Sequence, residues 1–208
     1  MQNIAVLASG NGTNFAAIAR AIKKGSLKAT LALLVCDVAN AKVIARAKRA
    51  GVKTMVIQGR ECATKNDFET KIIQRLKEEK IDLIILAGFM RILSPEFVRE
   101  YKNRIFNIHP SLLPSFKGTH GIKDAFEYGV KITGVTVHLV DEELDHGPII
   151  LQEKVKIEEN DTLESLEKKI HRVEHSLYPK AVQLLLEGKI TIQGRKILTA
   201  TRPGQPTH

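Results

Sequence analysis

In the first half of the chain, short apolar runs alternate with longer segments in which apolar residues recur every three or four positions. The runs are rich in Val, Ile and Leu, which is typical of strands buried on both faces of a sheet. The periodic segments predict helices, and this alternation predicts a parallel sheet covered on both sides. The predicted strands are 3–9, 30–36, 53–57, 82–88 and 104–109, and the predicted helices are 14–25, 41–51 and 66–80.

The second half of the chain has a different pattern. Two predicted strands, 131–140 and 148–157, are separated by the acidic loop 141–147, a connection that suits antiparallel pairing. The segment 162–188 has helical periodicity, and we expect a kink or break at Pro179 because proline removes a backbone hydrogen bond. This half therefore predicts an antiparallel end to the sheet, followed by a long helical segment.

The length of 208 residues suits one domain, and no internal repeat or low-complexity linker divides it. We assign residues 1–188 to this domain and residues 189–208 to a C-terminal hairpin and mobile polar tail, not a separate domain. No apolar run approaches membrane-spanning length, and no basic segment precedes the N-terminal run. Two cysteines, Cys36 and Cys62, are too few for a disulfide framework. These features predict a soluble, cytoplasmic protein.

The formal charge is +9 and the isoelectric point is near 9.6, values that also occur in nucleic-acid-binding proteins. Lysines and arginines are interleaved with glutamates along the predicted helices, however, as on solvated helix faces. Aromatic residues make up only 5% of the chain, so a base-stacking platform is not indicated. We therefore expect no nucleic-acid partner, and the surplus charge suits small anionic substrates.

The segment SGNGTN, residues 9–14, lies between the first predicted strand and the first predicted helix. Its glycines allow the backbone to approach an anion, and the helix offers free N–H groups and the positive end of its dipole. The segment lacks the glycine spacing of a dinucleotide site and the lysine of a P-loop. It predicts either a site for a single phosphate or a tight turn with an asparagine cap.

The strand 104–109 ends in two polar side chains, Asn107 and His109, which share one face and precede Pro110. Ligands sit at strand ends in α/β sheets. Histidine is easily poised near neutral pH and asparagine can donate to an oxyanion, so the pair suits acyl transfer. Asp145 of the acidic loop would favour the protonated imidazole if it reached His109. Alternatively, Asn107 and His109 are only a polar strand end that bonds the following loop, and Asp145 lies in an ordinary solvated turn.

The segment HRVEH, residues 171–175, matches a short zinc-protease pattern in which two histidines one helical turn apart bind the metal. Such a site needs a third ligand, and Glu187 is the downstream candidate. Because short patterns arise by chance, a zinc hydrolase is kept as an alternative only. His138, within a predicted strand, is expected to be a core histidine with at most a supporting role.

Four segments, taken in order, resemble the phosphoribosylglycinamide formyltransferase family. They are SGNGTN, LAGFMRILSPEFV, NIHPSLLPSFKG and GVTVHLVDEELDHGPII. The resemblance covers residues 3–188 and implies a single Rossmann-like α/β domain, with a mostly parallel sheet flanked by helices and an antiparallel C-terminal part. It also implies a step of purine synthesis, in which the co-substrate 10-formyltetrahydrofolate gives its formyl group to the amine of glycinamide ribonucleotide.

The same resemblance implies the roles of individual residues. Asn107 and protonated His109 would stabilise the oxyanion, Asp145 would tune His109 and move protons, and no metal is required. His171 stands where the family commonly has a lysine. The implied ribonucleotide site is Gly12, Thr13, Asn14, His171 and Glu174, and the implied folate site is Lys65, Met90, Arg91, Ile92, Leu93, Asp141, Glu142, Glu143 and Leu144.

Two further alternatives stay open. Formyltetrahydrofolate deformylase shares the histidine and folate-loop motifs, but it has a regulatory domain before a core of this kind, whereas here the first strand begins near residue 3. A non-catalytic phosphate-binding module would keep SGNGTN without chemistry at His109. The expected partners are the two small-molecule substrates, with no membrane, and a homodimer is left open.

Overall fold

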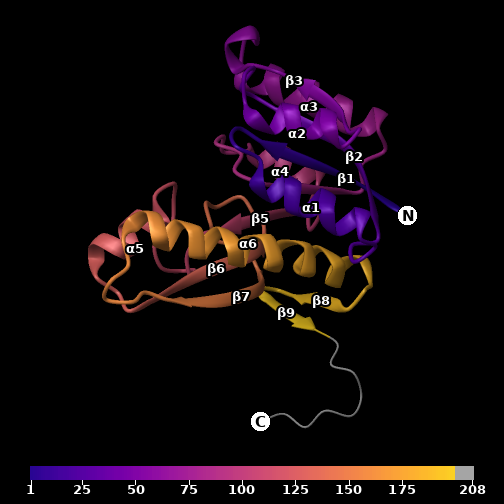
Figure 1. The fold of residues 1–208 in the computed structure, drawn as a ribbon. Helices are drawn as coiled ribbons and strands as arrows, with labels where there is room; N and C mark the ends of the chain where they lie inside the picture. The colour runs from indigo at the N-terminus through magenta and orange to yellow at the C-terminus, as the bar shows by residue number, and fades with distance from the viewer. Residues whose placement is uncertain (200–208) are drawn as a thin grey trace.

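Residues 1–199 are described by a computed structural model, in which helices cover both faces of a seven-stranded sheet (Figure 1). A two-stranded hairpin ends this part of the chain. The strands are β1 (Gln2–Ala8), β2 (Ala29–Cys36), β3 (Lys53–Val56), β4 (Leu83–Leu86), β5 (Ile105–His109), β6 (Ile132–Leu139), β7 (Ile149–Lys156), β8 (Ile190–Gln193) and β9 (Lys196–Thr199). The helices are α1 (Thr13–Lys23), α2 (Lys42–Arg49), α3 (Lys65–Glu78), α4 (Pro95–Glu100), α5 (Gly121–Tyr128) and α6 (Leu163–Leu186), with a 3₁₀ turn at Gly59–Glu61.

The strand order of the sheet is β3-β2-β1-β4-β5-β6-β7. Strands β1 to β5 are parallel, whereas β6 pairs antiparallel with both β5 and β7. The chain first winds from β1 towards β3 and then returns to β4 on the other side of β1, so the loops after β1 and β4 diverge. The predicted mostly parallel α/β sheet with an antiparallel C-terminal part is confirmed.

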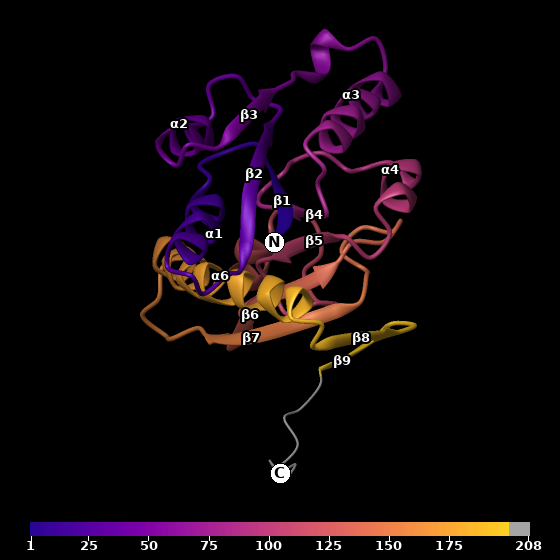
Figure 2. The ribbon, with the colours of Figure 1, turned by 90° about the vertical axis from the view of Figure 1, so that its right-hand side faces the viewer.

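Alternate residues of the central strands enter two different cores. On β1, Ile4, Val6 and Ala8 belong to the core beneath α1, α2, α5 and α6, whereas Ala5 and Leu7 pack with α3 and α4. Figure 2 shows α3 and α4 on the opposite side of the sheet from α1 and α6. Because both faces are covered, these strands read as continuous apolar runs in the sequence.

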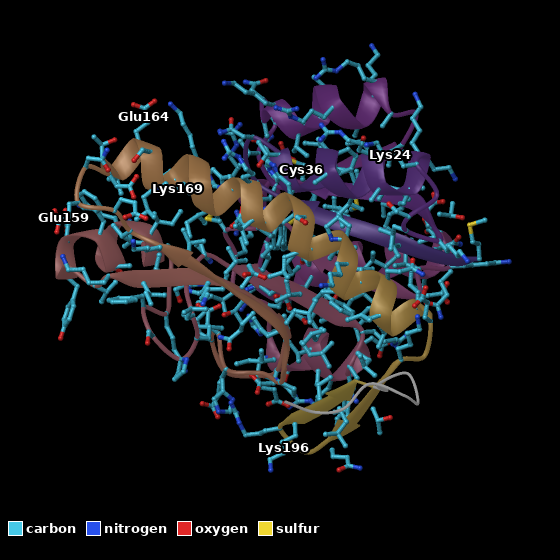
Figure 3. The ribbon with its side chains drawn as sticks, turned by 60° about the horizontal axis from the view of Figure 1, so that its bottom comes forward. Lys24, Cys36, Glu159, Glu164, Lys169 and Lys196 are labelled. Carbon is cyan, nitrogen blue, oxygen red and sulfur yellow. The ribbon has the colours of Figure 1, made fainter. Side chains whose placement is uncertain are left out.

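Helix α6 is continuous throughout its length, and a break at Pro179 is therefore wrong (Figure 3). Proline cannot donate the bond that would reach the carbonyl of His175, a loss of about 3 kcal/mol in a helix interior. Tyr178 and Val182, on either side of it, are fully buried against the sheet. Burying such side chains stabilises by about 1.5–3 kcal/mol each, so packing holds the helix together across the proline.

The sequence pattern does not predict α4 and α5, which lie in segments that leave the strand ends. With six residues, α4 is too short to show a helical period, although it carries local start signals. Ser94 caps it by accepting a hydrogen bond from the Phe97 N–H at 3.1 Å, and Pro95 occupies its first turn. Local capping chemistry therefore identifies α4 where periodicity does not.

The hairpin of β8 and β9 lies beside β7 (Figure 2). Ile192 and Ile197 pack against the same core as α6, which anchors the hairpin to the domain. The predicted mobile tail at 200–208 lies outside the described residues, so the division of the chain at residue 188 stays a prediction. Within residues 1–199, no helix is both long and apolar enough to cross a membrane.

Candidate active site

A cavity of about 810 Å³ lies at the edge of the sheet where β1, β4 and β5 end. Parallel strands bring their carboxyl ends to the same edge, and the divergence of the loops after β1 and β4 leaves a crevice there. The cavity is lined by residues within 9–14, 86–93, 107–110, 118–123 and 138–145, together with Val98 and with Leu163, Glu167, His171 and Glu174 of α6. The structure therefore brings the two polar strand-end residues and the glycine-rich segment to one place.

His109 is 3% exposed, and both nitrogens of its ring face acceptors. Its Nε2 lies 2.7 Å from the carbonyl oxygen of Phe116, and its Nδ1 lies 3.4 Å from Oδ2 of Asp145. Nε2 can donate a hydrogen bond to the Phe116 carbonyl, and the Asp145 carboxylate faces the other nitrogen of the ring. The carboxylate of the acidic loop therefore reaches the histidine at the end of β5.

Asp145 is held by several donors, which a buried carboxylate requires. Its side chain is 8% exposed, and its Oδ2 accepts a hydrogen bond of 2.8 Å from the backbone N–H of Gly118. Nδ2 of Asn107 lies 3.4 Å from Oδ1. The backbone of Asp145 has a φ of 48°, a left-handed conformation that costs energy in a residue other than glycine. The acidic loop is therefore strained at the residue that faces His109.

His138 contacts Asn107 directly, because the two residues are register partners on β6 and β5. Nδ1 of His138 lies 2.8 Å from the carbonyl oxygen of Leu139 and must donate to it, which leaves Nε2 as an acceptor. Nδ2 of Asn107 lies 3.1 Å from that Nε2. Burial lowers the pKa of His138, in keeping with a neutral ring. His138 thus fixes which way the Asn107 amide points.

The glycine-rich segment is shaped by contacts with α2. Gly12 has a φ of 69°, and a Cβ there would collide with Val43. The N–H of Val43 donates to the carbonyl of Gly10 at 3.1 Å, and Nε of Arg46 donates to the carbonyl of Asn11 at 2.8 Å. No side chain of residues 1–199 caps the first turn of α1, so its N–H groups are available to an anion.

Glu174 of α6 is buried beside this segment and accepts two hydrogen bonds at Oε2. Nδ2 of Asn14 donates at 3.0 Å, and Nδ1 of His171 lies 2.9 Å away. The hydrogen bond to Glu174 raises the pKa of His171, which favours a cation next to the glycine-rich segment. Oδ1 of Asn14 is buried without a hydrogen-bond partner among the described residues, so a polar ligand atom would satisfy it.

The segment after β4 gives the cavity an apolar mouth. Met90 and Ile92 are 65% and 67% exposed, and Leu144 of the acidic loop is 54% exposed, whereas Leu93 is buried. Exposed apolar side chains grouped at a cavity are typical of a ligand site. The Arg91 side chain is occupied elsewhere. Its Nε lies 2.8 Å from Oδ2 of Asp37, and its guanidinium lies 4.8 Å from the centre of the Phe68 ring.

The acidic loop is held by its own side chains and by one ion pair. Nδ1 of His146 lies 2.7 Å from Oδ2 of Asp141, and the N–H of Glu143 donates to Oδ1 of the same carboxylate at 3.1 Å. Glu142 pairs with Arg99 of α4 at 3.1 Å. These contacts give the three acidic residues of the loop a structural role in the cavity wall. The carboxylates of Asp141 and Glu142 are already paired with His146 and Arg99.

Lys65 is the one residue of the implied sites that does not line the cavity. It is the first residue of α3, where its side chain is 57% exposed, and its Nζ lies 3.8 Å from Oε1 of Glu69. Its partner Glu69 accepts a hydrogen bond of 2.9 Å from the N–H of Ser94, so the first turns of α3 lie beside the segment after β4. A role for Lys65 at the folate stays a prediction.

The HRVEH segment does not assemble a metal site in the described chain. His171 and His175 stack with ring centroids 6.5 Å apart, but Glu187, the candidate third ligand, pairs with Lys189 at 2.5 Å. Within residues 1–199, no group of three or more His, Cys, Asp or Glu side chains could hold a metal ion. Glu174 of this segment is instead bonded to Asn14.

Some cavity residues were not singled out from the sequence. Glu167 lies one helical turn before His171, so helical periodicity alone could have found it. Lys123 enters from the first turn of α5, which follows Asn107 and His109 along the chain. His120, just before that helix, also lines the cavity, and for this residue the family resemblance does suggest a place near the substrate. No local sequence pattern around the start of α5 predicts that this segment folds back to line the cavity.

A family model described as Formyl transferase matches residues 2–182. Phosphoribosylglycinamide formyltransferase of Bacillus subtilis (strain 168) is 45% identical over 186 residues, which cover 89% of this chain and 95% of that protein. Trifunctional purine biosynthetic protein adenosine-3 of Gallus gallus is 43% identical over 189 residues, 91% of this chain but only 19% of that protein. The crystal structure of glycinamide ribonucleotide transformylase 1 from Symbiobacterium toebii is similar with a TM-score of 0.93 at 40% identity, covering 96% of this chain and 94% of that one.

Proposed function

The chain belongs to the formyl transferase family, and we propose that it transfers a formyl group from 10-formyltetrahydrofolate to the amine of glycinamide ribonucleotide in purine synthesis. Family membership makes the chain a formyltransferase. The donor, the acceptor and the roles of individual residues are the proposal. The names of full-length bacterial relatives support this choice of acceptor.

One observation carries the proposal. Within one cavity, the Asp145 carboxylate lies 3.4 Å from both Nδ2 of Asn107 and Nδ1 of His109, and the cavity also contains the glycine-rich loop. An amide and an imidazole can stabilise an oxyanion, and a carboxylate can relay protons. The loop adds a place for phosphate. Together these groups suit acyl transfer to a phosphorylated amine.

The proposed reaction begins when the amine of the ribonucleotide attacks the formyl carbon. A C–N bond forms, and the formyl oxygen becomes an oxyanion that accepts hydrogen bonds from His109 and Asn107. The tetrahedral centre collapses when the bond from the formyl carbon to the folate nitrogen breaks. The proton lost by the attacking amine is delivered to that nitrogen through water and Asp145. The products are the formamide and tetrahydrofolate, and no covalent enzyme intermediate forms.

The hydrogen-bond donors for the oxyanion have protein partners in this structure. Nε2 of His109 faces the carbonyl of Phe116, and Nδ2 of Asn107 is shared between His138 and Asp145. The contact of 3.4 Å between Asn107 and Asp145 is the longest of the three and therefore the weakest. The proposal requires the formyl oxygen to replace this contact and the Phe116 carbonyl to give way when substrates bind.

The ribonucleotide is proposed to lie between α1 and α6. Its phosphate would accept hydrogen bonds from the backbone and side chains of Gly12, Thr13 and Asn14 at the start of α1. Protonated His171 would add positive charge to this site. Both side chains that bond Glu174 use Oε2, so Oε1 would accept hydrogen bonds from the ribose.

The folate is proposed to cover the apolar mouth of the cavity. Its ring system would bury Met90, Ile92 and Leu144, which are exposed without it. Backbone N–H and C=O groups of residues 90–93 and 141–144 would form hydrogen bonds with the polar edge of the ring. The folate is a co-substrate, and the proposed chemistry needs no metal. We place the reaction in the reducing cytosol, in keeping with Cys36 and Cys62, which form no disulfide.

The test is a spectroscopic assay of folate release from 10-formyltetrahydrofolate, with and without glycinamide ribonucleotide. The proposal expects release that depends on the ribonucleotide, survives EDTA and falls roughly 10²–10³-fold in His109→Ala. Release without the ribonucleotide would indicate a deformylase, and inactivation by EDTA would indicate a zinc hydrolase. If the folded protein releases no folate under any condition, the non-catalytic phosphate-binding module is the remaining alternative.

A further inference from the structure

The tip of the C-terminal hairpin reaches the loop that carries Asp145. Gly194 and Arg195 are the two residues between β8 and β9, and Gly194 has a φ of 59°, the left-handed conformation needed at the first central position of a tight hairpin turn. This turn leaves Arg195 at the hairpin tip. Nη2 of Arg195 donates a hydrogen bond of 2.7 Å to the backbone carbonyl of His146, and Nη1 contacts the His146 ring.

The loop needs an external anchor at this point. Asp145 has left-handed backbone geometry, which is strained in a residue other than glycine and persists only when surrounding contacts enforce it. At Gly147 the loop passes so close to the carbonyl of Leu139 that a Cβ would not fit. The hydrogen bond from Arg195 is made to the carbonyl of His146, the residue between Asp145 and Gly147. It fixes the peptide group that follows His146, one residue after the strained Asp145.

The hairpin can serve as a rigid anchor because it is itself held by the domain. Ile192 and Ile197 pack against the core beneath α6, on either side of the turn that bears Arg195. A hydrogen bond from a charged guanidinium to a carbonyl is stronger than one between neutral groups. Nδ1 of His146, which lies 3.0 Å from Nη1 of Arg195, is also 2.7 Å from Asp141 and 3.9 Å from Glu143, so acidic side chains flank the ring that the cation contacts.

We propose that Arg195 is a positioning residue for formyl transfer: from the hairpin tip it holds the peptide that follows His146, and so sets both the Asp145 carboxylate and the folate-facing side of loop 141–147. The inference rests on the proposed function. It gives a role to residues 189–199, which lie beyond the motifs of the formyltransferase resemblance.

Three full-length variants test this role. Arg195→Ala removes the anchor, and Arg195→Lys keeps a donor that can reach the same carbonyl. Lys196→Ala is the matched control, because Lys196 is exposed on the same hairpin and its substitution removes a charge without touching the loop (Figure 3). Arg195→Ala is expected to raise the KM for 10-formyltetrahydrofolate by roughly three- to tenfold and to lower kcat. In Arg195→Ala, the KM for the ribonucleotide and the Tm are expected to stay unchanged. Arg195→Lys is expected to recover part of the lost activity, and Lys196→Ala to have the kinetic constants of the parent.

Hydrogen exchange gives a second readout that needs no activity. Amides of 141–147 are expected to exchange faster in Arg195→Ala, while those of 9–14 exchange as in the parent. Unchanged exchange and unchanged donor KM would overturn the proposal, and so would equal rises in both KM values together with a lower Tm. If the parent protein transfers no formyl group, the proposed function fails, and the exchange comparison still decides whether Arg195 holds the loop.

Discussion

Nδ2 of Asn14 donates a hydrogen bond of 3.0 Å to Oε2 of Glu174, across 160 positions of the sequence. The two residues are 9% and 4% exposed and join the start of α1 to the middle of α6. Both line the cavity. One buried contact therefore sets the distance between the proposed phosphate loop and the proposed ribose contact.

Replacing Asn14 by Ala is expected to raise the KM for the ribonucleotide about tenfold, because Glu174 loses a donor and the phosphate loop loses its tie to α6. The KM for the folate donor should stay near the parent value. Steady-state kinetics with each substrate varied in turn would measure this difference. Asn66→Ala, at an exposed position of α3, is the matched control. A rise shared equally by both KM values would contradict the proposed division of the cavity.

Asp145→Asn is expected to lower kcat by roughly 10²–10⁴-fold while leaving the KM for the ribonucleotide unchanged. The amide keeps the size of the side chain and can still accept from the Gly118 N–H, but it cannot take up the amine proton. Single-turnover measurements would separate the chemical step from product release. Asp124→Asn, exposed on α5, should behave as the parent. A main effect on KM would mean that Asp145 binds substrate and does not move protons.

The pair of His171 and Glu174 predicts a dependence of stability on pH. The hydrogen bond to Glu174 raises the pKa of His171, so folding favours the protonated ring. This contribution is fully present below about pH 6.5, the usual pKa of an unfolded histidine, and is lost as the pH rises through the folded pKa. Urea unfolding at several pH values should therefore show the stability difference between the parent and His171→Gln shrinking as the pH rises.

An NMR titration supplies the control for this interpretation. Glu174→Gln removes the carboxylate, so the pKa of His171 should fall from its raised value. Burial lowers the pKa of the neighbouring His175, so its titration distinguishes the two rings. No fall in the His171 value would show that Glu174 is not the cause.

Tyr178→Phe is expected to lower the free energy of unfolding by about 1–3 kcal/mol, because buried carbonyl groups lose a donor. The hydroxyl of Tyr178 lies 2.7 Å from the carbonyl oxygen of Leu86 and 3.1 Å from that of Phe106. Its burial also raises the pKa of the phenol well above the usual value. Tyr128→Phe, at a position 79% exposed, should change stability little. Equal urea midpoints for the two variants would rule out this role for Tyr178.

Much of the fold was predictable because its signals are local. The continuous apolar runs of β1, β2 and β4 require burial on both faces, and that condition is met only inside a parallel sheet covered by helices. The alternation along β5 placed Asn107 and His109 on one face, and their position before Pro110 placed them at a strand end. The site residues that the family motifs implied, Lys65 excepted, all line the cavity.

Other features were decided only by tertiary structure. Asp145 meets His109, and Arg195 meets the loop after Asp145, because distant segments pack at the same edge of the sheet. Lys65 lies outside the cavity, although its place in the sequence suited the family pattern. The continuity of α6 through Pro179 likewise depends on buried neighbours. Backbone preferences act over a few residues, so the sequence by itself determined the strands, the main helices and the polar strand end. Contacts between buried polar groups depend on the packing of the whole sheet, and only that packing decided which side chains meet.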